Sequence, residues 1–168
     1  MKAAVLQAAM QGKLTEQLET DSSVDDLLED IKKEREKLVA EGKIKKSRTK
    51  QNDNFVQLSD DEMPFERPDN WRWVRFGDIS TYGNSLSKIS PEKIKPDMWC
   101  LDLEDIEKGT GTVIQKVYAK DRKIDGDKTL FVSGQILYSK LRPYLLKVLI
   151  ADEDGICTPE LVPFSVFT

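Results

Sequence analysis

The stretch from Gly134 to Phe164 constrains the fold most strongly, because it is the most apolar and aromatic part of the chain. Residues 136–141 form an extended run, and apolar residues alternate with others across residues 146–150, as in a second strand. Residues 152–155 have the composition of a turn, and residues 161–167 are again rich in strand-forming types. Consecutive short strands joined by turns predict a β-rich domain.

The first of these strands carries a stripe of aromatic and cationic residues. A period of two places Tyr138, Lys140 and Arg142 on one face, and Tyr144 continues the stripe if Pro143 does not rotate it away. Proline restricts the residue before it, so we expect Arg142 in a β or polyproline conformation. Such a stripe suits nucleic acid, because cations meet phosphates and aromatic rings pack on sugars or bases. The alternative is the solvated face of a half-buried hairpin, which the spacing alone favours.

Four stretches of the chain, in this order, resemble the specificity subunits of Type I restriction–modification systems. The fourth of them resembles the target recognition domain of these subunits, and together the four cover most of the chain. They are residues Leu6–Leu14, Pro64–Ile79, Leu103–Gly111 and Ile136–Cys157.

The resemblance implies a function without chemistry of its own. The chain would read one half of a bipartite site in double-stranded DNA. It would dock methyltransferase (M) subunits and, through them, the restriction (R) subunit. It would bind no cofactor, because S-adenosylmethionine, ATP and Mg²⁺ would belong to those partners. The Leu-Arg-Pro-Tyr motif recurs in members of the family that read different sites, so Arg142 is expected to contact the DNA backbone or brace the fold.

The composition excludes several classes of enzyme. The chain contains no histidine, which removes histidine acid–base catalysis, Ser-His-Asp and Cys-His sites, and the usual zinc sites. The two cysteines, Cys100 and Cys157, are far apart in sequence, as expected of free thiols in a cytoplasmic protein. The net charge of −4 gives no support to DNA binding, so any DNA contact must come from local clusters of cations.

One pattern resembles an enzyme. Asp97, followed by residues 121–123 (Asp-Arg-Lys), has the residue types of a metal-dependent nuclease. The chain is rich in Asp and Lys, so the pattern arises easily by chance. The sequence between the two segments also does not predict a hairpin that would bring them together. A nuclease therefore remains the weakest alternative.

The N-terminal part predicts two helices. Residues 2–11 form a short helix that Gly12 ends, and a longer helix begins after an N-cap at Ser22 or Ser23 and ends at Gly42. The longer helix carries a narrow apolar stripe that must pack on its own domain or on a partner, and the two readings are equally supported. As partner-binding residues the stripe provides Val24, Leu27, Leu28, Ile31 and Leu38.

The predicted fold class is α+β, with three parts. Residues 1–42 form a helical hairpin that serves as a docking arm, and residues 43–63 form a charged linker. Residues 64–168 form a mostly antiparallel, β-rich target recognition domain, in which Trp71 and Trp73 begin a strand as packing residues.

We expect this domain to be incomplete at its C-terminus. The missing part would leave a sheet edge open to pairing with a second copy in a homodimer. A protein-interaction or self-associating remnant without independent DNA binding is therefore the alternative function.

The candidate DNA-binding residues come from the stripe and from one loop. Residues 83–90 are rich in Ser and Asn, and loops of this kind carry recognition more often than frameworks do. The expected contacts with DNA are Ser87, Lys88, Tyr138, Lys140, Arg142 and Tyr144.

Overall fold

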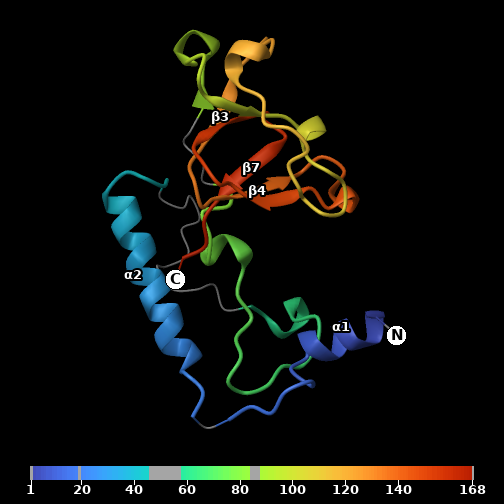
Figure 1. Cartoon of the computed structure of the whole chain (residues 1–168). Coiled ribbons are helices and arrows are strands. Elements are labelled where there is room, and N and C mark those ends of the chain that lie inside the picture. Colours follow the sequence, from blue (N-terminus) through green and yellow to red (C-terminus); the bar gives the residue numbers. More distant parts are fainter. Residues whose placement is uncertain (1, 19, 46–57, 84–87, 168) are drawn as a thin grey trace. The chain divides into compact units, whose positions relative to one another are not determined.

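The computed structural model describes residues 2–18, 20–45, 58–83 and 88–167 (Figure 1). Contacts divide the chain into two compact units. The helical unit comprises residues 1–42, 46–79 and 167–168, and the sheet unit comprises residues 43–45 and 80–166. Residues 64–79 are thus grouped with the helices, whereas the sequence-based division places them with the strands; most of the predicted linker lies outside the described residues.

Two α-helices form in the helical unit, α1 (Lys2–Met10) and α2 (Val24–Ala40). The predicted N-cap of α2 is confirmed at Ser23, whose side chain accepts a hydrogen bond from the Asp26 N–H at 3.3 Å. The helix ends where predicted, because Gly42 takes a φ of +69°, a conformation that glycine adopts without strain. Two short 3₁₀ turns complete this unit, η1 (Asp60–Glu62) and η2 (Phe76–Asp78).

The predicted strand at Trp71 and Trp73 is wrong. Residues 71–75 belong to no helix or strand. The Trp73 ring packs edge-on against Phe65, with 4.9 Å between the ring centroids, and the Trp71 Nε1–H donates to the Gln17 side chain at 2.8 Å. The two indoles are therefore held by side chains of their own unit rather than by a sheet.

The sheet unit holds a four-stranded and a three-stranded sheet. The first has the order β1-β3-β6-β2 and the second the order β5-β4-β7. The strands are β1 (Lys88–Ile89), β2 (Trp99–Leu101), β3 (Lys128–Phe131), β4 (Ile136–Ser139), β5 (Val148–Ile150), β6 (Gly155–Cys157) and β7 (Leu161–Phe164). Short 3₁₀ turns connect them: η3 (Pro91–Lys93), η4 (Leu103–Asp105), η5 (Ala119–Asp121) and η6 (Pro143–Leu145).

Strand pairing is antiparallel except between β2 and β6, which run parallel with Cys100 opposite Ile156. The α+β class, with two N-terminal helices and mostly antiparallel sheets, is confirmed. Val113 and Tyr118 form isolated bridges, Val113 with Ile106 and Tyr118 with Trp99.

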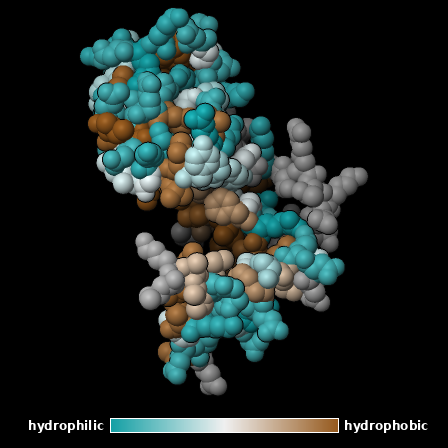
Figure 2. Space-filling model, turned by 90° about the vertical axis from the view of Figure 1, so that its right-hand side faces the viewer, coloured by the Kyte–Doolittle hydropathy of each residue, from teal (hydrophilic) through white to brown (hydrophobic). Residues whose placement is uncertain are grey.

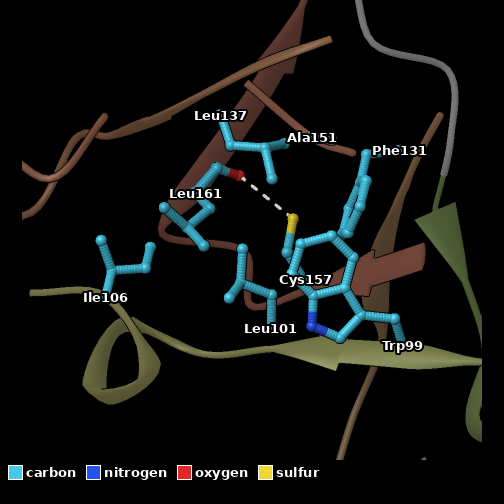
Figure 3. Packing of buried hydrophobic residues seen from close by; sticks show 8 residues of the cluster. All are labelled: Trp99, Leu101, Ile106, Phe131, Leu137, Ala151, Cys157 and Leu161. Carbon is cyan, nitrogen blue, oxygen red and sulfur yellow. Dashed lines mark hydrogen bonds between the residues drawn. The ribbon is translucent and has the colours of Figure 1, made fainter. Parts of the chain in front are cut away.

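The core of the sheet unit lies between residues of both sheets (Figure 3). Trp99 and Phe131 meet edge to face, with 5.2 Å between their ring centroids. Leu137 of β4 and Leu161 of β7 complete the cluster from the three-stranded sheet, and both are almost fully buried. The face of β4 that carries Leu137 is therefore buried in this core, and the residues that follow β4 continue from a strand that the core holds in place.

Candidate nucleic-acid interface

The predicted stripe leaves the sheet after Ser139, where β4 ends. The buried Ser139 hydroxyl donates to the Leu141 carbonyl at 2.8 Å, and the Lys140 N–H donates to the Glu160 carbonyl at 3.0 Å. Residues 140–146, called the 140–146 turn below, then connect β4 to β5. The period of two that aligned Tyr138 with Lys140 and Arg142 therefore ends before Lys140.

The backbone of the 140–146 turn is left-handed at both ends of η6. Arg142 and Leu146 each have a φ of +51°, so the expected β or polyproline conformation of Arg142 is wrong. The reversal lets the Leu145 N–H donate to the Arg142 carbonyl at 2.9 Å, and Pro143 has the φ that a first helical residue needs. A left-handed non-glycine residue costs about 1 kcal/mol, so the surrounding contacts must hold this shape.

The side chains of the 140–146 turn point to solvent. Tyr144 is 73% exposed and Leu146 is 60% exposed, and Lys140 and Arg142 are exposed as well. No acidic residue occurs between Gly134 and Asp152, while this stretch contains Lys140, Arg142 and Lys147. Figure 2 views the molecule from the side that carries this turn in Figure 1, and brown apolar side chains lie among teal ones on the sheet unit.

Tyr138 lies apart from the exposed turn. It is half-buried on the outer face of β4, and its ring meets Tyr82 edge-on, with 6.3 Å between the centroids. Tyr82 also packs against Phe164 of β7 at 5.5 Å. Tyr138 is thus a packing residue of the sheet from which the 140–146 turn projects.

The predicted loop site belongs to the other sheet. Lys88 is exposed on β1, where it lies opposite Thr129 of β3. In the part of the chain that the structure describes, no hydrogen bond, ion pair or ring contact joins Lys88 to the 140–146 turn. Ser87 lies outside the described residues.

A buried ionic network, which the sequence analysis missed, holds the loop before β3. Arg122 donates through Nη1 to Asp102 and through Nη2 to Asp105 at 2.8 Å, and Lys128 donates to Asp102 at 2.9 Å. Burial alone would lower the pKa of Arg122, but the hydrogen bonds with Asp102 and Asp105 raise it overall. The network ties residues 119–128 to η4.

Part of this network has a sequence signal. Asp102 and Asp105 are three residues apart, and each side chain accepts a hydrogen bond from the other residue's backbone in a capping box. That spacing can be read from the sequence. The pairing with Arg122, far along the chain, has no local signal.

The residues of the nuclease-like pattern are brought nearer than expected. The Lys120 N–H donates to the Pro96 carbonyl at 3.0 Å, so the two segments lie side by side despite the lack of a predicted hairpin. Asp97 and Asp121 are both exposed, and Lys123 pairs with Asp125 at 3.1 Å. Within the described ranges, no group of three or more His, Cys, Asp or Glu residues could hold a metal ion.

The predicted partner-binding stripe of α2 is largely covered. Ile31 is buried, Val24, Leu28 and Leu38 are half-buried, and Leu27 is exposed. Two ion pairs attach α2 to its own unit: Arg35 with Asp78 at 3.4 Å and Asp25 with Arg72 at 3.0 Å.

An apolar pocket of about 280 Å³ lies in the same unit. The aromatic rings of Phe65, Trp71 and Trp73 form its wall, together with Met10 at the end of α1. Four more apolar side chains near α1 are exposed: Val5, Leu6, Leu14 and Leu18. The helical unit therefore offers apolar surface mainly on and after α1, where the sequence analysis named no partner-binding residue.

Curated relatives are restriction-system proteins of Escherichia coli. The chain is 33% identical over 112 residues to the Type I restriction enzyme EcoDI specificity subunit, which is 67% of this chain and 24% of that protein. It is 40% identical over 87 residues to the EcoAI specificity subunit and 42% identical over 79 residues to the EcoEI specificity subunit. These matches cover 52% and 47% of this chain, and 14% and 12% of the two relatives.

The chain spans at most about a quarter of the length of these relatives. No family model matches it. No helix in the described ranges is long and apolar enough to cross a membrane.

Two solved structures are similar at 20% sequence identity. One is the HsdS subunit from Thermoanaerobacter tengcongensis, with a TM-score of 0.48, and the other comes from a study of assembly of the type I R-M system, with a TM-score of 0.49. Each superposition covers 61% of this chain and 27% of the solved chain. The sequence matches to the curated relatives establish that this chain is related, over a part of their length, to the specificity subunits of Type I restriction enzymes.

Proposed function

We propose that this chain is a non-catalytic DNA-recognition component of a Type I restriction–modification system in the cytoplasm. It reads one half of a bipartite site in double-stranded DNA. The sequence matches to three specificity subunits support this role. The observation that carries the DNA-binding part is the 140–146 turn, which exposes Lys140 and Arg142 and lies in a stretch without an acidic residue. The third cation of the stretch, Lys147, is half-buried and donates to the Leu103 carbonyl.

The contacts divide by their chemistry. Lys140 and Arg142 are exposed cations, so they suit phosphates, and the exposed Tyr144 beside them suits sugars and base faces. Lys88, on the other sheet, suits a base edge together with the neighbouring Ser87. Tyr138 contributes by packing the sheet under the turn.

The test is selection of bound sequences from a pool of random duplexes by the 168-residue chain. The wild type should enrich a short site. Lys88→Ala should relax the preference at one or two positions, with a loss of about 1–3 kcal/mol for the best site, because it removes a base contact. Arg142→Gln should weaken binding to all sequences by the same factor, because it removes a phosphate contact. If the folded wild type enriches no sequence, it does not read DNA on its own.

We further propose that the helical unit docks methyltransferase subunits and, through them, the restriction subunit. The apolar pocket and the exposed apolar side chains of this unit support this, because extensive exposed apolar surface marks protein contacts. Leu27 is the exposed member of the α2 stripe, with Val24, Leu28 and Leu38 contributing their partly exposed edges. Ile31 is buried, so it contributes by packing α2 in place rather than by touching the partner.

A pull-down with the methyltransferase subunit tests the docking surface. Leu27→Asp should reduce capture about tenfold or more if Leu27 is buried in the contact. Ile114→Asp is the matched control, because Ile114 is a similarly exposed aliphatic residue of the sheet unit, 65% accessible. Equal capture by both variants would remove the α2 stripe from the interface.

Self-association is the second candidate function, favoured by one feature of the sheet. The outer side chains of the edge strand β5, Val148 and Ile150, are exposed, and Ile150 is 69% accessible. An apolar edge strand invites pairing with another chain. Sedimentation equilibrium of the chain measures this: a homodimer that Ile150→Lys dissociates would support it, and a monomer at all concentrations would dismiss it.

A further inference from the structure

We propose that the 140–146 turn enters the minor groove of DNA and bends the duplex by pressing Tyr144 and Leu146 against base steps. This inference rests on the proposed DNA-binding function and adds to it a groove, a contact chemistry and a change in DNA shape. It concerns a single turn whose exposed side chains are described throughout.

The form of the turn suits the narrower groove. The major groove, about 12 Å wide, admits a whole helix or a two-stranded ribbon, whereas the minor groove is about 6 Å wide. What projects beyond the end of β4 is one 3₁₀ turn, Pro143–Leu145, and not a helix. An element of this size fits the minor groove with its side chains directed at the base pairs.

Hydrogen bonds hold the backbone of the turn in shape. The Leu145 N–H donates to the Arg142 carbonyl at 2.9 Å, and the Leu146 N–H donates to the Pro143 carbonyl at 3.0 Å. From outside the turn, the Gly109 N–H donates to the Leu145 carbonyl at 2.8 Å. The left-handed residues at both ends of η6 are thus fixed by hydrogen bonds within the turn and by a second loop.

The chemistry of the tip combines apolar groups with cations. Minor-groove proteins insert leucine, proline and other apolar side chains between base steps, while Arg and Lys beside them contact phosphates. Leu141, Pro143, Tyr144 and Leu146 are exposed apolar or aromatic residues of this turn. Arg142 forms no ion pair among the described residues, so its charge is available to a polyanion.

Charge complementarity favours DNA over a protein as the occupant of the turn. The charged residues between Gly134 and Asp152 are all cations: Lys140, Arg142 and Lys147. Lys140 makes a small contribution to the lowered pKa of the Glu160 carboxyl. The larger effects on that pKa come from the hydrogen bonds of Glu160 with Thr158 and its own backbone. A turn with two exposed cations beside exposed apolar side chains suits an anionic groove.

Leu146→Gly is the most informative substitution. Glycine adopts the φ of +51° without strain, so this change removes the side chain and preserves the shape of the turn. The thermal midpoint should therefore stay the same or rise. Ile114→Thr is the matched control, because it changes another exposed aliphatic side chain of the sheet unit that lies outside the turn.

The experiment measures the bend and the affinity together. The probe is a pool of duplexes of about 30 base pairs with a randomised centre and a dye at each end, and energy transfer between the dyes reports the end-to-end distance. The wild-type chain should bend the duplex by about 20–90°. Leu146→Gly should abolish the bend and lower the affinity about tenfold, with an unchanged salt dependence, because it removes only apolar contact. Ile114→Thr should leave both unchanged.

The outcomes separate the two proposals. Binding without a bend, or a bend that Leu146→Gly retains, overturns the proposal that the turn bends DNA and leaves the proposed DNA recognition in place. No binding at low salt by the folded wild type overturns both. If Leu146→Gly then changes the sedimentation of the chain, the turn is a protein contact.

Discussion

The guanidinium of Arg122 lies 2.8 Å from the carboxylate of Asp105, and that carboxylate is completely buried. Asp105 also accepts a hydrogen bond from the Gln115 side chain at 3.0 Å. A buried carboxylate is tolerated only when a cation and hydrogen bonds compensate its lost hydration. Arg122 is therefore the residue that permits η4 to pack beneath residues 119–128.

Arg122→Ala should lower the free energy of unfolding by about 3–5 kcal/mol, because it leaves the buried carboxylate of Asp105 without its cation. Urea titration followed by tryptophan fluorescence measures the change. Lys123→Ala is the control, since Lys123 pairs with Asp125 on an exposed surface and such pairs contribute little. Similar losses in both variants would show that the Arg122 network does not carry this stability.

The stability of the sheet unit should depend on pH, because Asp102 is protonated in acid. Burial raises the pKa of this carboxyl. The hydrogen bonds from Lys128 and Arg122, with the charges of these two residues, lower it by a larger amount, so the pKa in the folded state lies below the usual 3.8. A pKa lowered by folding stabilises the native state above the unfolded value, and that contribution is lost as the pH falls through the folded value. The contribution should therefore be present at neutral pH and be lost in acid, as the pH falls below the usual pKa of an aspartate.

Asp102→Asn removes this titration. Its unfolding free energy should be lower than that of the wild type at neutral pH and should fall less on acidification. Asp125→Asn, which neutralises an exposed carboxylate, serves as control. Urea titrations at several pH values make the comparison, and parallel pH profiles for wild type and Asp102→Asn would assign the acid sensitivity to other groups.

Both thiols should be unreactive in the native protein. Cys100 and Cys157 are fully buried, and burial raises the pKa of each, to about 12 for Cys157. The thiolate is the reactive form, so Ellman's reagent at about pH 8 should modify neither residue until the chain is denatured, when both react. Rapid modification under native conditions would mean that the core around β2 and β6 opens readily.

Gly111→Ala should destabilise the protein by at least about 2 kcal/mol, for two reasons that add. Gly111 has a φ of +71°, which alanine adopts only with strain, and an added methyl group would collide with the Val148 carbonyl of β5. Gly126→Ala is the matched control, because that position has free space and no left-handed backbone. Thermal unfolding distinguishes them, and equal midpoints would mean that residues 109–111 do not pack on β5.

Local sequence signals predicted much of the secondary structure. Ser23 and Gly42 mark the ends of α2 because capping depends on neighbouring residues only. The three strands of the Gly134–Phe164 stretch form as β4, β5 and β7, as their apolar composition predicts. In β5, however, the alternating residues Val148 and Ile150 face solvent, and Leu149 between them packs against the core.

The features that the sequence did not predict depend on contacts between residues that are distant in the chain. The segment at Trp71 has strand-like composition but belongs to no strand. Arg142 is left-handed because the turn after Pro143 is closed by hydrogen bonds, one of them from Gly109. The parallel β2–β6 pair and the Arg122 network likewise join residues that no local pattern connects.

The candidate site shows the same division. The sequence identified Lys140, Arg142 and Tyr144 as neighbours, and the structure places them on one exposed turn. It grouped Tyr138 with them through the period of two, which holds only while the strand continues. Whether these residues bind DNA stays a prediction.

The most direct test is the salt dependence of duplex binding by the 168-residue chain. We predict that the wild type binds DNA at low salt, that the affinity falls linearly with salt on a log–log scale, and that Arg142→Gln reduces the slope by about one. That result would place the guanidinium of Arg142 at a phosphate. Absence of binding by the folded wild type, or an Arg142→Gln slope equal to that of the wild type, would contradict the assignment of the 140–146 turn as a DNA contact.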